Sequence, residues 1–240
     1  GTEGYEEISF KTPGSVTLRG WLIRAQTPKK GTIIYLHGYS EKISTHIDNF
    51  LWLKDAGYDI FLFDYRGSGR TGVAPSLGEI HLATERAIET AFNIPGVNGD
   101  PVFVLGQSLG GAASIYAVAN SRYKNSISGL IIESSFSSYL ALTEEKLKDL
   151  GVFRPSGGIQ TGPADDSHSP SRWIHDISPV PVIIIHGEAD ETIPLRSGLE
   201  LYDRAARPKE LLIAAGKGHM QALTDGDIRR RLTSHLASVN

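Results

Sequence analysis

One serine of the chain lies between glycines in the pattern that places a nucleophile on a sharp turn. The motif Gly106-Gln107-Ser108-Leu109-Gly110 follows an apolar run at residues 102–105 and precedes a helical segment with almost no polar face. Strand, tight turn and helix in this order are typical of a nucleophile elbow. The helix N-terminus beyond the turn favours developing negative charge. We therefore predict that Ser108 is a nucleophile, with a helix-capping serine as the alternative.

A serine nucleophile needs a general base, and the base needs an acid that orients it. His219 is the best placed of the eight histidines, because it follows the last predicted strand in the run Gly216-Lys217-Gly218-His219-Met220. The predicted acid is Asp190, which follows the apolar run 182–185, and the reserve acid is Glu133, which ends another strand. A surface histidine and a helix cap are the alternatives for His219 and Asp190. The order serine, aspartate, histidine belongs to one triad fold and not to the others.

Acyl transfer also needs backbone N–H donors for the oxyanion of its tetrahedral intermediate. Leu109, directly after the serine, supplies one donor. The second is expected from Tyr39, in the turn Leu36-His37-Gly38-Tyr39-Ser40, because Gly38 lets the chain turn tightly there. His37 is expected to stabilise this turn rather than to act in catalysis.

Large side chains adjacent to these loops are candidates for the walls of a substrate pocket, although core packing is the alternative for each aromatic. The candidates are Tyr39, Phe136, Tyr139, Trp173, Ile193 and Met220. The polar character of the neighbouring segment 154–172 favours small or medium acyl groups over long-chain triglycerides.

Short apolar runs must position these residues. The runs are nearly continuous rather than alternating, as expected for parallel strands covered on both faces. They lie at residues 32–36, 59–63, 102–105, 129–132 and 182–185. Segments with helical spacing separate them, for example residues 77–91. This alternation predicts a doubly wound, mostly parallel α/β sheet flanked by helices.

The two ends of the chain and one central stretch depart from the alternation. Residues 6–11 and 18–24 are expected to form an antiparallel hairpin at the sheet edge. Residues 210–214 and 227–239 are expected to form a last strand and a closing helix. Residues 134–179 hold one predicted helix (140–150) and a run rich in Gly, Pro, Ser and Asp (154–172). We predict a single domain over 1–240 with a lid insertion at 134–179; a disordered insertion is the alternative.

Motifs in this order resemble those of the α/β-hydrolase superfamily: LHGYSE, FDYRGSGRTG, GQSLGG, HGEADETIP and GKGHM. Within the superfamily, YEEISFKTP, LRGWLI, DYRGSG and IIESSFSS make the chain similar to Bem46/ABHD13-like serine hydrolases. The resemblance covers residues 5–219, apart from 154–172. It implies Ser108, Asp190 and His219 as a triad, Tyr39 and Leu109 as oxyanion donors, and esterase-type chemistry. The single glycine of HGY differs from the HGGG of many lipases, which argues against esters of bulky alcohols.

Composition excludes several classes of function. The net charge of −3 over 240 residues gives no basic footprint, so nucleic acid is not an expected partner. The absence of cysteine excludes disulfides, Cys-ligated zinc and thiol nucleophiles. No apolar run approaches the roughly 20 residues that span a bilayer. The chain starts at Gly1, and membrane contact is expected only if an N-terminal anchor has been removed. Compartment and oligomeric state stay open.

Two further patterns are not expected to bind ligands. The run Gly67-Ser68-Gly69-Arg70-Thr71-Gly72 matches GxGxxG, but Pro75 interrupts the chain before the following helix, which argues against a dinucleotide site. A metal site built from His168, His175, Asp165 and Asp166 would lie in a Gly- and Pro-rich setting without ligand spacing on a rigid element. A solvated acidic loop is expected there instead.

These residues together predict a serine hydrolase that cleaves carboxylic esters with small to medium acyl groups through an acyl-enzyme. The expected partner is a small-molecule ester, and no metal or organic cofactor is required. A peptidase or amidase on the same triad remains open. So do a thioesterase, for which no basic cradle for coenzyme A is visible, and a non-catalytic binding module that keeps the fold.

Overall fold

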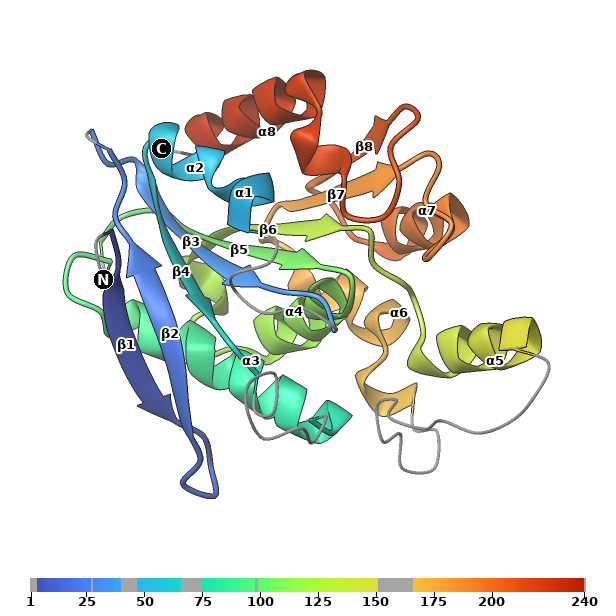
Figure 1. The fold of residues 1–240 in the computed structure, drawn as a ribbon, viewed down its shortest axis with the longest axis horizontal. Coiled ribbons are helices and arrows are strands. Elements are labelled where there is room, and N and C mark those ends of the chain that lie inside the picture. The colour runs from blue at the N-terminus through green and yellow to red at the C-terminus, as the bar shows by residue number, and fades with distance from the viewer. Residues whose placement is uncertain are drawn as a thin grey trace.

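A computed structural model of the chain describes residues 4–26, 28–39, 47–65, 75–97, 99–150 and 166–239. Its centre is an eight-stranded sheet in the order β1-β2-β4-β3-β5-β6-β7-β8 (Figure 1). The strands are β1 (Glu6–Lys11), β2 (Thr17–Ile23), β3 (Gly31–Leu36), β4 (Tyr58–Phe63), β5 (Val102–Gln107), β6 (Ile127–Glu133), β7 (Val182–Gly187) and β8 (Lys209–Ala214). The β1–β2 and β2–β4 pairs are antiparallel, and the pairs from β4 to β8 are parallel. The predicted sheet and its edge hairpin are confirmed.

The central strands are apolar along their whole length because both faces of the sheet are covered. Every residue of β3, β4, β5 and β7 is buried. Within β3, Ile34 and Leu36 contribute to one hydrophobic core, whereas Ile33 and Tyr35 contribute to a second. Successive side chains of a strand point to opposite faces, so the two cores lie on opposite sides of the sheet.

Helices form the two outer layers (Figure 1). The first core is covered by α3 (Leu77–Phe92), α4 (Leu109–Asn120), α6 (Pro170–Trp173) and α7 (Leu195–Arg204). The second is covered by α1 (Ile47–Phe50), α2 (Trp52–Asp55) and α8 (Gly226–Ser238). The remaining helical elements are α5 (Tyr139–Leu150), which lies beyond the carboxyl ends of the strands, and the short turns η1 (Lys124–Ser126), η2 (Asp166–His168), η3 (Ile174–Ile177) and η4 (Ala222–Thr224).

The segment predicted as a lid is described at both of its ends. Helix α5 matches the helix predicted at 140–150. The later part, from η2 to η3, belongs to the body of the domain, because Ile174 and Ile177 are fully buried in the first core. Residues 151–165, most of the predicted polar run, lie outside the described residues, as does the run Gly67–Gly72.

A buried histidine on α3 holds η2 and α5 against the domain. The Tyr139 hydroxyl lies 3.3 Å from Nε2 of His81, and the His168 ring lies 4.6 Å from the His81 ring. The ring of Tyr116 packs against both histidines. Burial, with a smaller contribution from the nearby His168, lowers the pKa of His81 to about 3. His81 is therefore neutral in the folded protein across the physiological range.

This shift makes part of the folding free energy dependent on pH. As the pH falls below about 6.5, the unfolded chain binds a proton at residue 81 before the folded chain does. The contribution of neutral His81 to the free energy of unfolding is complete above that pH. It decreases by roughly 1.4 kcal/mol per pH unit as the pH falls towards about 3. We expect His81→Gln to remove this part of the slope. Urea unfolding of both proteins between pH 8 and pH 4 checks it; two parallel stability curves would contradict the assignment.

Candidate active site

The turn between β5 and α4 holds Ser108 in a strained conformation. Its φ of 51° and ψ of −117° are rare for a residue with a side chain. A Cβ on Gly106 would lie 2.5 Å from the Gly110 carbonyl oxygen, and a Cβ on Gly110 would lie 2.2 Å from the Leu36 carbonyl oxygen. Only glycine fits at both positions, so the motif follows from the close approach of three backbone segments. The serine side chain is left at the carboxyl edge of the sheet.

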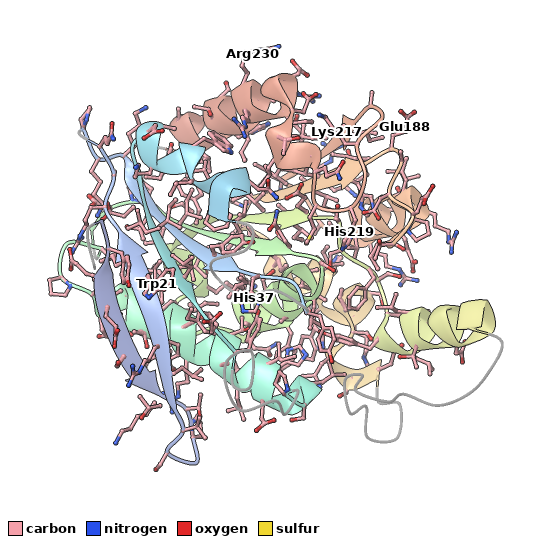
Figure 2. The ribbon with its side chains drawn as sticks, viewed as in Figure 1. Trp21, His37, Glu188, Lys217, His219 and Arg230 are labelled. Atoms are coloured by element: carbon pink, nitrogen blue, oxygen red, sulfur yellow. The ribbon has the colours of Figure 1, made fainter. Side chains whose placement is uncertain are left out.

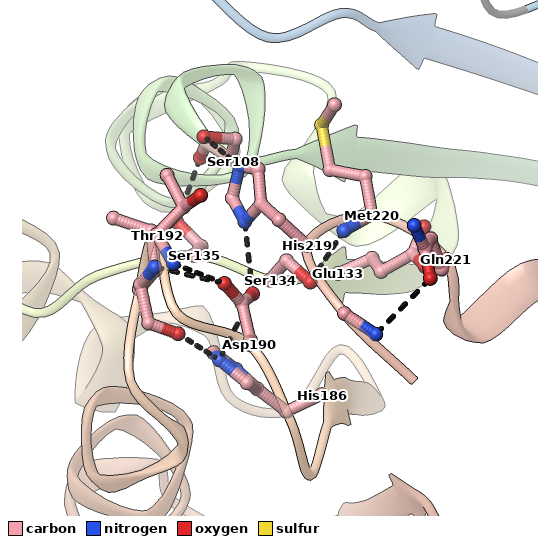
Figure 3. Close-up of polar contacts among 12 residues, drawn as sticks. Ser108, Glu133, Ser134, Ser135, His186, Asp190, Thr192, His219, Met220 and Gln221 are labelled. Carbon is pink, nitrogen blue, oxygen red and sulfur yellow. Dashed lines mark hydrogen bonds and ion pairs between the residues drawn. The ribbon is translucent and has the colours of Figure 1, made fainter. Parts of the chain in front are cut away.

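The structure brings together the three residues that the sequence predicts as a triad (Figure 3). Nε2 of His219 lies 3.1 Å from Oγ of Ser108, and Nδ1 of His219 lies 2.8 Å from Oδ2 of Asp190. An ionised carboxylate only accepts hydrogen bonds, so Nδ1 carries the proton and Nε2 is left to accept one from the serine. This arrangement can remove a proton from the Ser108 hydroxyl.

The Asp190 carboxylate is buried and fixed by backbone donors. Its Oδ1 accepts hydrogen bonds from the N–H groups of Thr192 at 3.0 Å and Ile193 at 2.9 Å. Burial alone would raise the pKa of Asp190, but the hydrogen bonds from His219 and Ile193, with smaller electrostatic contributions from the nearby His219 and His186 rings, bring it below its ordinary value. The lowered pKa favours the ionised carboxylate at neutral pH.

A second histidine supports the same loop. His186, at the end of β7, is fully buried, and its Nε2 donates to the Ile193 carbonyl at 2.8 Å. The same nitrogen lies 3.6 Å from Oδ2 of Asp190. Burial lowers the pKa of His186, which favours the neutral ring. His186 stands in the motif HGEADETIP without a predicted role, and its position four residues before the acid is the signal that could have marked it.

The other acids near the predicted triad have different contacts. The carboxylate of Glu133, the reserve acid, accepts from Leu223 N–H at 3.0 Å and from Gln107 Nε2. Glu188 lies at the outer surface near Lys217 (Figure 2), where it accepts from Gly216 N–H at 3.1 Å. The acid that hydrogen-bonds His219 is Asp190.

The two backbone segments expected to form an oxyanion hole meet at the elbow. Leu109 is the first residue of α4, and the close approach of Gly110 to Leu36 sets this helix against the end of β3. Tyr39 follows in the turn after β3. The ring of His37 is buried in this turn, and its Nδ1 donates to the Gly38 carbonyl at 2.6 Å. This contact is of the kind expected for a turn-stabilising residue.

Of the six predicted pocket residues, two line a cavity, and Tyr39 lies exposed in the turn after β3. Phe136 and Ile193 line a cavity of about 170 Å³ between the start of α5 and the start of α7, and Met220 lies next to His219. By contrast, Tyr139 is packed in the core with its hydroxyl at His81, and Trp173 donates from Nε1 to the Ser167 carbonyl at 2.6 Å. The structure does not bring these two aromatics to the cavity.

Residues predicted to form an acidic loop lie close to the body of the domain. His168 packs on His81, and the Asp166 carboxylate accepts from Ser138 Oγ and from the Leu140 N–H. Asp165 lies outside the described residues. Within the described ranges, no cluster of three or more His, Asp or Glu side chains could hold a metal ion. In the same ranges no helix has the length and apolarity to cross a bilayer.

Comparison with known proteins places this geometry in a family. The model of a hydrolase family described as serine aminopeptidase, S33, matches residues 27–154. Uncharacterized protein YfhR of Escherichia coli O157:H7 is 31% identical over 231 residues, covering 94% of this chain and 78% of its own. Protein bem46 of Schizosaccharomyces pombe is 28% identical over 195 residues, covering 79% and 62%.

A solved structure shows the same fold. The esterase Pf2001 of Pyrococcus furiosus superposes with a TM-score of 0.74 at 18% identity, covering 98% of this chain and 92% of its own. The resemblance to Bem46-like hydrolases is confirmed by the sequence match, and the architecture by the superposition. The chain therefore belongs to the α/β-hydrolase superfamily, in the family described as serine aminopeptidase, S33.

Proposed function

We propose that this chain is a serine hydrolase that cleaves carboxylic esters through an acyl-enzyme on Ser108. One observation carries the proposal: an unbroken line of hydrogen bonds runs from Oγ of Ser108 through His219 to Asp190. The strained backbone of the serine and the depressed pKa of the aspartate support it. Both features are typical of sites that activate a hydroxyl nucleophile.

In the first half-reaction, His219 Nε2 accepts the Ser108 proton as Oγ attacks the ester carbonyl carbon. Asp190 stays ionised and stabilises the imidazolium. The backbone N–H groups of Leu109 and Tyr39 bind the oxyanion. His219 then donates its proton to the leaving alcohol oxygen as the ester bond breaks. In the second half, His219 deprotonates a water molecule that attacks the acyl carbon. The bond to Ser108 Oγ then breaks, His219 returns the proton to Oγ, and the carboxylic acid leaves.

A cavity beside the Asp190 loop, lined by Ile193 but by none of Ser108, Asp190 and His219, supports small to medium acids as the acyl part of the ester. Its volume of about 170 Å³ and the apolar side chains of Phe136 and Ile193 suit a short acyl chain. A peptidase that recognises the free amino terminus of its substrate would need a carboxylate to pair with the terminal ammonium group. The carboxylate that lines this cavity already has partners within the chain, which favours the ester. Glu200, which lines the cavity, already accepts from Ser137 Oγ at 2.7 Å and pairs with Arg204 at 3.1 Å.

Intact mass measured after treatment with a fluorophosphonate tests the proposal. We expect one adduct on the wild-type chain and none on Ser108→Ala. Rates on p-nitrophenyl esters from C2 to C12, set beside aminoacyl anilides, then separate the substrate classes. A peak at or below C8 with little anilide cleavage is expected. An unlabelled wild-type protein would overturn the proposal. Cleavage of anilides faster than of esters would indicate a peptidase instead of an esterase.

A further inference from the structure

The last residue of β6 and the two residues after it contact the backbone on both sides of the proposed triad. We call Glu133, Ser134 and Ser135 the β6 clamp. On the nucleophile side, the Glu133 carbonyl accepts from Ser108 N–H at 2.9 Å. The Ser135 hydroxyl donates to the Ser108 carbonyl at 2.8 Å. The backbone of the nucleophile is thus held from both of its peptide groups.

On the base side, the clamp holds the chain just after His219 (Figure 3). Oγ of Ser134 accepts from Met220 N–H at 3.0 Å, and Oε1 of Glu133 accepts from Leu223 N–H at 3.0 Å. Met220 has a φ of 54°, a conformation that residues with a side chain rarely adopt. Such a conformation persists only where surrounding contacts determine it, and these two hydrogen bonds do so.

The Glu133 carboxyl is a costly group to bury, and its surroundings explain its orientation. It is fully buried, and its partners are donors: the N–H groups of Leu223 and Ala222 and the Gln107 amide. The Tyr35 hydroxyl donates to the other end of the Gln107 amide, which turns Nε2 towards Glu133. The Gln107 amide holds the carboxyl from β5, so the hydrogen bonds from the Leu223 and Ala222 N–H groups are lost if the 220–223 segment shifts, and the carboxyl thereby fixes the position of that segment.

We propose that Glu133 and Ser134 are positioning residues that fix His219 relative to Ser108. They act through the backbone of residues 220–223 and do not touch the substrate. A displacement of about 1 Å between a nucleophile and its base costs about 100-fold in rate. The inference rests on the proposed function, because only an enzyme that uses Ser108 and His219 together needs this alignment.

Three variants test the alignment through kcat and KM on a p-nitrophenyl ester. Ser134→Ala removes the acceptor for Met220 N–H, and Glu133→Ala removes the acceptor for Leu223 N–H. We expect each to lower kcat by about 100-fold, with KM within about twofold of wild type. Glu133→Gln keeps an amide oxygen for Leu223 N–H. Gln107 then turns over, so that its oxygen accepts from the new amide group and its NH₂ donates to the Tyr35 hydroxyl oxygen, which can accept as well as donate. This variant is expected to recover most of the lost kcat.

A matched control separates alignment from general stability. Asp59 is another buried carboxylate, at the opposite end of the sheet, where it accepts from Ala25 N–H at 2.8 Å and pairs with Arg24 at 3.0 Å. Asp59→Asn should lower the melting temperature without lowering kcat, when all proteins are assayed well below their melting temperatures.

Several outcomes would overturn the inference. They are unchanged kcat in Ser134→Ala, an equal loss of kcat in Asp59→Asn, or a Glu133→Gln variant as slow as Glu133→Ala. The fluorophosphonate experiment keeps the two proposals apart. A labelled wild type with unaffected clamp variants would refute the positioning role alone, whereas an unlabelled wild type would refute the hydrolase.

Discussion

Replacing Ser108 by alanine is expected to lower kcat on an activated ester by about 10⁶-fold. In the proposed mechanism the hydroxyl oxygen forms the acyl-enzyme. Among the residues that the structure describes, the hydroxyl placed on His219 Nε2 is that of Ser108, with its Oγ at 3.1 Å. Alanine keeps the Cβ that the elbow already accommodates at a φ of 51°. The fold should therefore survive, and thermal unfolding of the variant checks it.

Ser114→Ala is a fitting control for this loss. Ser114 is a fully buried serine on the same helix, and its hydroxyl donates to the Gly111 carbonyl at 2.7 Å, away from the relay. It should turn over esters at close to the wild-type rate. Residual hydrolysis above about 1% in a pure Ser108→Ala sample would point to a different nucleophile.

Replacing Asp190 by asparagine is expected to lower kcat by about 10⁴-fold with little change of structure. The N–H groups of Thr192 and Ile193 both donate to Oδ1, so the amide oxygen of the variant would take that place. Its NH₂ group would then face Nδ1 of His219. The imidazole would adopt the tautomer with its proton on Nε2, which cannot accept the serine proton.

Steady-state kinetics on the same ester measure this effect. Glu191→Gln, a change of an exposed carboxylate next to Asp190, should leave kcat near its wild-type value. If Asp190→Asn kept more than about a tenth of the activity, another acid would have to orient His219. Glu133 would then be the first candidate, and a double variant would decide.

Much of the fold could be predicted because local patterns and burial agree. Strands buried on both faces are unbroken apolar runs in the sequence. The predicted runs 32–36 and 182–185 end within two residues of the ends of β3 and β7. Helix α3 was expected at 77–91 and spans Leu77–Phe92, and its start has a capping box between Ser76 and Glu79. The boundaries of such strands and helices can be predicted because the residues at their ends determine them.

The active site was predictable only where a motif marks the residue. The GxSxG turn and the loops after β7 and β8 identify Ser108, Asp190 and His219 as neighbours. By contrast, Glu133 and Leu223 are 90 residues apart along the chain, and no local pattern shows that they meet. The same limit applies to Tyr139. Its place beside the catalytic loops in sequence does not reveal that its ring turns towards His81.

The chain contains a single methionine, Met220, and its backbone N–H is held by Ser134 next to the candidate base. A sample labelled with ¹³C at methionine methyl groups would therefore give one methyl resonance from these 240 residues. That resonance would report on the candidate active site alone. Acylation of the serine, binding of an inhibitor and displacement of the His219 loop could each be followed there without assigning the rest of the spectrum.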